Sequence, residues 1–149
     1  MLHDNGLPAA AGPRRSIELD SVEALRLLGS VSFGRIVFTQ HALPMIRPVN
    51  HVLVDSGDIV IRIHDGAALT SRTRQAGAPG VVVAYEADAI DPQTHLGWSV
   101  VVTGYAHPVT DTDELARYAT VLRPWSQQTM DHAVRIRPDL VTGVRLTAV

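Results

Sequence analysis

Short runs rich in valine, isoleucine and aromatic residues recur along the chain between segments with glycine, proline or aspartate, which is the pattern of β-strands. Residues 98–109 form a long valine-rich run, in which Gly104 marks an expected bulge or barrel corner. Residues 80–88 are almost continuously apolar, as in a strand that is buried on both faces. We expect strands at residues 33–39, 47–54, 59–64, 80–88, 98–109, 132–137 and 141–147, with Pro138 and Asp139 separating the last two.

Two stretches change to the period of an amphipathic helix. In residues 17–29, Asp20 and Glu23 have the spacing of a capping box, and Gly29 ends the apolar stripe. Residues 111–122 repeat this arrangement, with an apolar stripe of Leu115, Tyr118, Ala119 and Leu122. A shorter helix is expected within residues 66–77.

The two runs around residues 55–58 predict a hairpin, because both are rich in β-branched residues and the segment between them is polar and contains glycine. A four-residue loop would pair Val54 with Ile59 and would place His51 opposite Arg62. A shift of one residue would exchange the cross-strand partners, so the prediction depends on the turn.

In this register one face of the hairpin is apolar and the other is cationic. The cationic face collects Arg47, His51, Arg62 and His64, and the first acidic residue after them is Asp65. This face is either a solvated strand surface or a seat for an anion. The apolar face would contain Ile46, Pro48, Val52, Val54, Ile59, Ile61 and Ile63, with Asn50 as its polar member.

This order of elements favours a mainly β (α+β) fold with antiparallel strands. Consecutive hairpin links produce antiparallel pairing, and closure into a small barrel removes the exposed edges of many short strands. We therefore expect an antiparallel barrel with flanking helices. Residues 1–15 are rich in glycine, proline and alanine and are expected to form a flexible arm, with residues 16–149 as one domain.

Composition excludes several classes of function. The net charge of −2 and the 5% of aromatic residues argue against a nucleic-acid partner. No cysteine is present, so thiol chemistry is excluded. No apolar run approaches the length of a membrane span, and the first residues lack the order of a signal peptide, so we expect a cytoplasmic protein without a membrane partner.

The sequence contains no local catalytic motif. The seven histidines lack the close spacing of metal ligands, so no metal site is predicted. Asp88 and Asp91 lie in or beside an expected loop and are interpreted as turn residues. Trp98 is either part of the core or the wall of a pocket for a flat ligand. Catalytic residues therefore stay unassigned.

Several segments, in their order and spacing, resemble the pyridoxamine 5′-phosphate oxidase-like, flavin-binding split-barrel family, and in particular its short actinobacterial-type members. The resemblance covers about residues 19–146. The matching segments include Gly34-Arg35-Ile36-Val37-Phe38, Arg47-Pro48-Val49-Asn50, Ile59-Val60-Ile61-Arg62, Val82-Val83-Ala84-Tyr85-Glu86-Ala87-Asp88, Gly97-Trp98-Ser99 and Arg137-Pro138-Asp139.

The resemblance implies a six-stranded split barrel that forms a homodimer, with FMN in a groove between the subunits. Residue by residue, it implies that the isoalloxazine edge is lined by Arg47, Pro48, Val49 and Asn50, that the phosphate is approached by Arg62, Ile63 and His64, and that Trp98 and Ser99 lie near the flavin from the facing subunit.

The chain departs from the family pattern at the phosphate. Ile63 replaces a threonine and Ala68 replaces a lysine, and each lost charge-assisted contact weakens binding by about 1.5–3 kcal/mol. Thr70, Ser71, Arg72 or Arg74 could compensate. We expect a flavin-dependent oxidoreductase with FMN, or with a deazaflavin coenzyme, and a small-molecule substrate. The alternatives are a non-enzymatic flavin-, haem- or anion-binding protein for storage, stress protection or sensing, and a dimeric scaffold without a cofactor.

Overall fold

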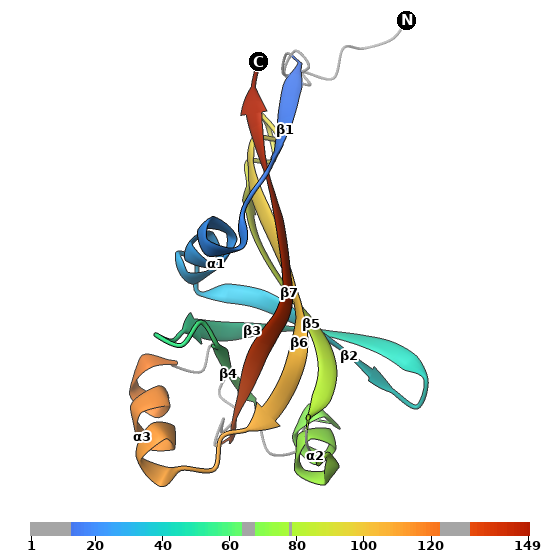
Figure 1. Cartoon of the computed structure of the whole chain (residues 1–149), viewed down its shortest axis with the longest axis vertical. Helices are drawn as coiled ribbons and strands as arrows, with labels where there is room; N and C mark the ends of the chain where they lie inside the picture. Colours follow the sequence, from blue (N-terminus) through green and yellow to red (C-terminus); the bar gives the residue numbers. More distant parts are fainter. Residues whose placement is uncertain (1–12, 64–67, 78, 123–131) are drawn as a thin grey trace, which may run out of the picture.

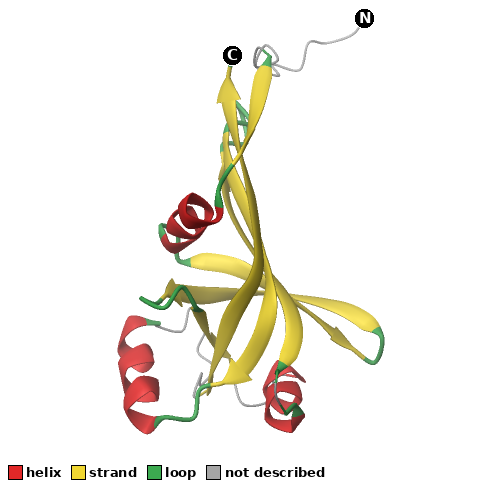
Figure 2. Cartoon of the chain, viewed as in Figure 1, coloured by secondary structure: helices red, strands yellow, loops and turns green. Residues whose placement is uncertain are grey.

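The computed structural model describes residues 13–63, 68–77, 79–122 and 132–149 (Figure 1). Its elements in chain order are β1 (Arg14–Glu18), α1 (Ser21–Gly29), β2 (Phe33–Gln40), β3 (Leu43–Leu53), β4 (Ile59–Ile63), α2 (Ala68–Gln75), β5 (Val81–Ile90), β6 (Gly97–Pro108), α3 (Thr112–Val121) and β7 (His132–Ala148). Strands make up most of the described chain, as Figure 2 shows.

Six antiparallel strands close into a ring. They follow the order β7-β4-β3-β2-β5-β6, and β6 pairs with β7 again to complete the circle. Strand β1 lies outside this ring and pairs with the last residues of β7. The predicted six-stranded antiparallel barrel with flanking helices is therefore confirmed, with one additional strand. Strand β1 begins at Arg14, so the last two residues of the expected arm belong to the sheet.

The last strand is one continuous element, and the prediction of two strands separated by Pro138 and Asp139 was wrong. Strand β7 pairs with β6 from Val134 to Leu146, on both sides of Pro138, with a register shift at Gly104 of β6. Thr103 pairs with Leu140 and Gly104 pairs with Pro138, so Asp139 is the extra residue of a bulge. A bulge accommodates a proline, which has no N–H to donate to the ladder.

The hairpin of β3 and β4 has a different register from the predicted one. Leu53 pairs with Ile59 and His51 pairs with Ile61, so the loop holds five residues instead of four. The extra loop residue moves the whole of β3 by one position relative to β4. Side chains alternate along a strand, and His51 therefore shares a face with Ile61 instead of Arg62.

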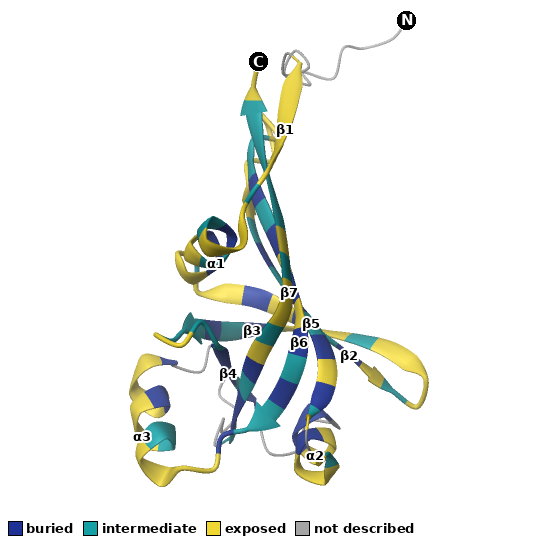
Figure 3. Cartoon of the chain, viewed as in Figure 1, coloured by how far each residue is buried: buried dark blue, intermediate teal, exposed yellow. Residues whose placement is uncertain are grey.

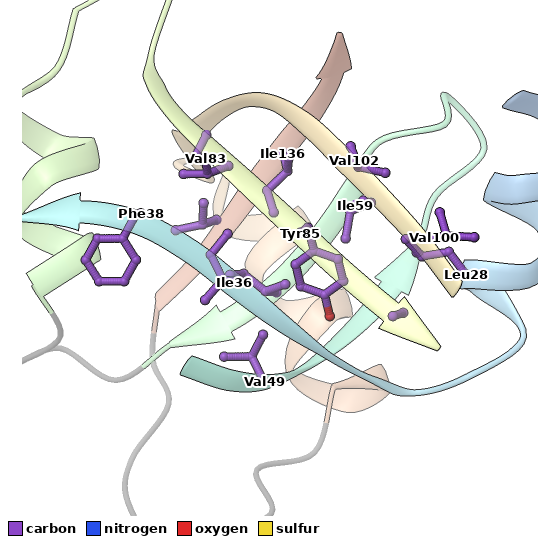
Figure 4. Packing of buried hydrophobic residues seen from close by; sticks show 14 of the residues in the cluster. Leu28, Ile36, Phe38, Val49, Ile59, Val83, Tyr85, Val100, Val102 and Ile136 are labelled. Carbon is purple, nitrogen blue, oxygen red and sulfur yellow. The ribbon is translucent and has the colours of Figure 1, made fainter. Parts of the chain in front are cut away.

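The barrel interior forms the main core. Figure 4 shows Tyr85 of β5 among Ile36, Val49 and Val100, which come from three other strands. Helix α1 adds Ala24, Leu27 and Leu28 to this core, and α2 adds Leu69. Helix α3 covers the outer side of β4 with a second cluster of Val60, Val109, Tyr118, Leu122 and Ala133.

Both predicted N-caps are present. The side chain of Asp20 accepts a hydrogen bond from the backbone N–H of Glu23 at the start of α1, and Asp111 accepts one from Asp113 at the start of α3. A cap of this kind satisfies an N–H group that has no partner within the helix. Both helices therefore begin at their predicted caps. The first helix is shorter than the expected residues 17–29, because Ile17 and Glu18 belong to strand β1.

Candidate functional site

The outer surface of β3, β2, β5, β6 and the middle of β7 is the candidate site, and we call it the open face. Direct pairing sets Pro48, Arg35, Glu86, Val101 and Thr142 side by side in one row across the five strands. Neighbouring rows add Asn50 and Phe33, Asp88, Ser99 and Val144 on one side, and Ile46, Val37, Ala84, Thr103 and Leu140 on the other.

Large apolar side chains on the open face are exposed. The exposed fractions are 50% for Phe33, 59% for Ile46, 40% for Val101 and 58% for Leu140. Bands of exposed residues run along these strands in Figure 3. These four side chains are spread over four strands of one sheet surface, around charged residues at its middle, and several exposed apolar side chains on one surface make it a candidate for binding another molecule.

A hollow of about 290 Å³ lies at the edge of the open face, beside Ser99. It is lined by Glu18, Leu19, Ser99, Val101, Val141, Thr142, Gly143 and Val144. Ser99 and Thr142 contribute hydroxyl groups and Glu18 a carboxylate, beside the apolar side chains of the other lining residues. A shallow surface that combines apolar side chains with a few polar groups can accommodate a flat ligand with a polar edge.

Arg35, Glu86 and Asp88 form a charged cluster at the middle of the open face. Nη1 of Arg35 lies 3.5 Å from Oε2 of Glu86 and 3.3 Å from Oδ2 of Asp88. Glu86 loses solvent and lies beside a second carboxyl, and these effects raise the pKa of Glu86 to about 7. Asp88 is thus part of a strand and of this cluster, and its interpretation as a turn residue was wrong.

Sequence reasoning missed this cluster. Glu86 and Asp88 are two residues apart on one strand, which places them on the same face. The spacing was visible in the sequence, but the nearness of Arg35 follows from the pairing of β2 with β5, which is not local. Asp91, in contrast, is a turn residue as predicted, because its carboxylate accepts hydrogen bonds from the N–H groups of Gln93 and Thr94.

Three of the predicted flavin-contacting residues lie together on the open face. Pro48 and Asn50 are on β3 at one side, and Ser99 is on β6 at the other. Two further strands separate them, which corresponds to a distance of about 14 Å across the sheet. The structure therefore brings these three residues to one surface.

Other predicted site residues point elsewhere. The side chains of Val49, Ile63 and Trp98 are buried in the barrel core. Trp98 and Ser99 are adjacent on β6 and so face opposite sides of the sheet. Of the two interpretations of Trp98, its position in the core is therefore the one that the structure shows. His64 lies outside the described residues.

The predicted cationic face of the hairpin does not form. His51 is buried, with Nε2 2.8 Å from the carbonyl oxygen of Leu28 and Nδ1 bonded to the hydroxyl group of Tyr85. Burial lowers the pKa of His51 and favours the neutral ring. The prediction was wrong because the hairpin loop is one residue longer than expected.

The two arginines of that face are also separated. Arg47 is exposed, and its Nη1 donates a hydrogen bond to the carbonyl oxygen of Ile46. Arg62 is partly covered by α3, and its Nη1 lies 2.7 Å from the carbonyl oxygen of Leu122. A cation at the end of a helix satisfies carbonyl groups that have no partner within the helix and interacts favourably with the helix dipole.

A second hollow, of about 380 Å³, lies beside α2. Its polar lining includes Arg74 and His132, with Nη2 of Arg74 3.0 Å from Nδ1 of His132. Thr70 also lines it and is buried, whereas Ser71 and Arg72 are exposed. Arg74 and Thr70, two of the residues considered as replacements for the missing lysine, are thus brought to one pocket.

Two further observations limit the chemistry of the described part of the chain. No three histidine or acidic side chains gather there in the manner of a metal site. None of its helices has the length and apolar character that crossing a membrane requires.

Comparison with known proteins identifies the family. The family model described as pyridoxamine 5′-phosphate oxidase matches residues 20–145, and the chain belongs to this family. The uncharacterized protein Rv0080 of Mycobacterium tuberculosis is 51% identical over 135 residues, which cover 91% of this chain and 88% of that protein.

Two solved structures have both the fold and clear sequence similarity. One is a Corynebacterium glutamicum protein that carries the name of this oxidase, with a TM-score of 0.71 and 34% identity over 90% of this chain and 95% of that one. The other is the FAD binding protein of Mycobacterium smegmatis, with a TM-score of 0.63 and 34% identity over 88% of this chain and 98% of that one.

Proposed function

We propose that this protein is an FMN-binding homodimer that acts as a flavin-dependent oxidoreductase, with the flavin held between the open faces of two copies. The observation that carries the proposal is the open face itself. It presents an apolar surface, a hollow beside Ser99 and the polar groups of Asn50 and Arg35. The family and the similarity to a flavin-binding protein support the same conclusion.

The open face of one chain is only half of such a site. The hollow beside Ser99 is shallow, and the apolar residues around it remain exposed. A second copy would cover these residues and would supply the opposite wall, because a twofold interface uses the same patch of both subunits. The proposal of a homodimer thus explains both the exposure and the incomplete pocket.

The residues available for the cofactor suit its ring better than its phosphate. Pro48, Asn50 and Ser99 can contact the ring system, while a bound flavin would supply the redox chemistry. On the side of the phosphate, Arg62 already bonds α3 and Ile63 is buried in the core. Arg74, at the hollow beside α2, is a candidate to replace the missing lysine. A deazaflavin coenzyme is an alternative occupant of the same face.

One observation favours a second candidate function, a binding protein without catalysis. The side chain of Ile63 faces the barrel interior and cannot replace the threonine hydroxyl at a phosphate. The loss of one charge-assisted hydrogen bond weakens binding by roughly tenfold or more. Weak flavin binding suits a storage or sensing role, or a scaffold without a cofactor, better than a permanently bound redox centre.

A titration with FMN, followed by the quenching of flavin fluorescence, tests the main proposal with two matched variants. Leu140→Lys places a charge at an exposed position of the open face, outside the row that contains Arg35 and Glu86, so the single chain tolerates it. Val22→Lys places the same charge on the exposed surface of α1. We expect the first variant to lose both dimer and flavin, and the second to keep both. Equal flavin affinity in the two variants would show that the open face is not part of the flavin-binding site.

A further inference from the structure

The charged cluster of Arg35, Glu86 and Asp88 lies where the proposed subunit contact would form. It occupies the central strands of the open face. The exposed side chain of Val101 lies in the row of Arg35 and Glu86, and that of Phe33 lies in the neighbouring row. Two carboxylates and one guanidinium give it a net charge of −1 when all three groups are ionised. Removing water from a cluster with unbalanced charge is unfavourable.

Glu86 is poised to take up the proton that would balance this charge. Its Oε1 atom is buried and has no hydrogen-bond partner in the part of the chain that the structure describes, while Oε2 faces Arg35. Burial and the neighbouring carboxyl of Asp88 already raise the pKa of Glu86 to about 7 in the single chain. A protonated carboxyl also gains a donor, which the second carboxyl can accept.

The surroundings of Glu86 contain few other charges. From β2 the facing charged group is Arg35, and from β5 it is Asp88. Val101, directly opposite on β6, and Ser99 beside it carry no charge. The behaviour of the cluster therefore depends mainly on these three charged side chains.

We propose that association of two copies through the open face is linked to the uptake of one proton by each pair of Glu86 and Asp88. This inference rests on the proposed dimer. In the single chain, water solvates the second negative charge. In the dimer that water is displaced, and a proton shared between the two carboxyls leaves the cluster neutral. The pH then regulates how firmly the site between the subunits is closed.

The sign of the effect follows from linkage. The dimer holds the proton more tightly than the single chain does, so the group titrates at a higher pH in the dimer than its pKa of about 7 in the single chain. Association is therefore strongest below about pH 7 and weakens as the pH rises above it. Two protons per dimer set a limiting slope of roughly two decades in Kd per pH unit.

Sedimentation equilibrium of the purified full chain at several pH values between about 6 and 9 tests the inference. We expect Kd to increase at least tenfold over this range. Glu86→Gln carries no titrating proton there and should show a flat profile with tight association throughout. Asp113→Asn, which removes an exposed carboxylate from α3, is the matched control and should behave as the parent chain.

The outcomes separate this inference from the proposed function. A dimer whose Kd is constant with pH overturns the proton linkage and leaves the dimer standing. A pH dependence that persists in Glu86→Gln overturns the assignment to this cluster. A monomer at every pH overturns the proposed dimer and, with it, this inference. If the variant does not fold, dilution calorimetry of the parent chain in buffers of different ionisation enthalpy still measures the proton uptake.

Discussion

His51 and Tyr85 form a buried hydrogen-bonded pair that connects two strands of the barrel. Nδ1 of His51 contacts the phenol oxygen of Tyr85, and the two rings meet edge to face with centroids 5.2 Å apart and an interplanar angle of 86°. Because Nε2 of His51 also contacts the carbonyl oxygen of Leu28, the pair links β3, β5 and the end of α1. This is the arrangement of a structural group in the core.

Gly34 gives Tyr85 the space that this pair requires. A Cβ atom at residue 34 would overlap the phenol ring of Tyr85. We expect Gly34→Ala to lower the free energy of unfolding by about 1–3 kcal/mol, since it overpacks the core and displaces the hydrogen bond. Urea unfolding measures the change. Gly77→Ala is the control, because a Cβ atom there meets open space. Equal stability of the two variants would contradict this role of Gly34.

The buried imidazole predicts a loss of stability in acid. Burial lowers the pKa of His51 in the folded chain. The contribution of this residue to the free energy of unfolding is therefore fully present above the pKa of histidine in the unfolded chain, about 6.5, and is lost as the pH falls below that value. Glu86 contributes with the opposite sign, because its pKa is raised on folding. We therefore compare parent and His51→Gln by urea unfolding at about pH 7 and about pH 5. The difference between their free energies of unfolding should be smaller at the lower pH. A difference that does not change with pH would show that His51 does not titrate in this range.

Arg62 tests the phosphate side of the proposed site. A phosphate contact would require the Arg62 guanidinium to exchange the carbonyl oxygen of Leu122 for the phosphate. On that basis we expect Arg62→Ala to weaken FMN binding at least tenfold and to loosen the end of α3. A fluorescence titration gives the first effect and thermal unfolding the second. Arg117→Ala removes an exposed arginine of α3 and should leave flavin affinity unchanged. Lower stability of Arg62→Ala with unaltered flavin affinity would restrict Arg62 to its contact with the helix.

Restoring the lysine of the family pattern should strengthen the binding of FMN. Ala68 begins α2, at the position where the resemblance places a lysine for the phosphate. We expect Ala68→Lys to tighten FMN binding by roughly tenfold to a hundredfold, the range that one charge-assisted hydrogen bond supplies. Riboflavin, which lacks the phosphate, is the control ligand and should gain nothing. An equal gain for both ligands would show that the lysine does not contact the phosphate.

The elements that follow from local chemistry could be predicted from the sequence. Helix α1 begins after Asp20 because the cap and the apolar stripe lie within one segment, and the valine-rich runs form strands as expected. The barrel followed from the resemblance and from the need to remove strand edges. The bulge at Gly104 was also predicted, and it is confirmed.

The relationships between distant segments could not be predicted in the same way. The position of His51 depended on the length of one loop, and an error of one residue moved it from the surface to the core. The cluster of Arg35 and Glu86 requires the pairing of β2 with β5. The continuous strand β7 required a bulge that accommodates Pro138. Pairing across the barrel, rather than any local pattern, decides each of these features.

Native mass spectrometry of the chain purified in the presence of FMN tests the central claim most directly, because it reads the number of subunits and of bound flavins in one particle. The proposed site between two open faces predicts a dimer that carries two FMN molecules. The Leu140→Lys variant should appear as single chains without flavin. A single chain that carries FMN by itself, or a dimer that takes up no flavin even at high concentration, would contradict the account.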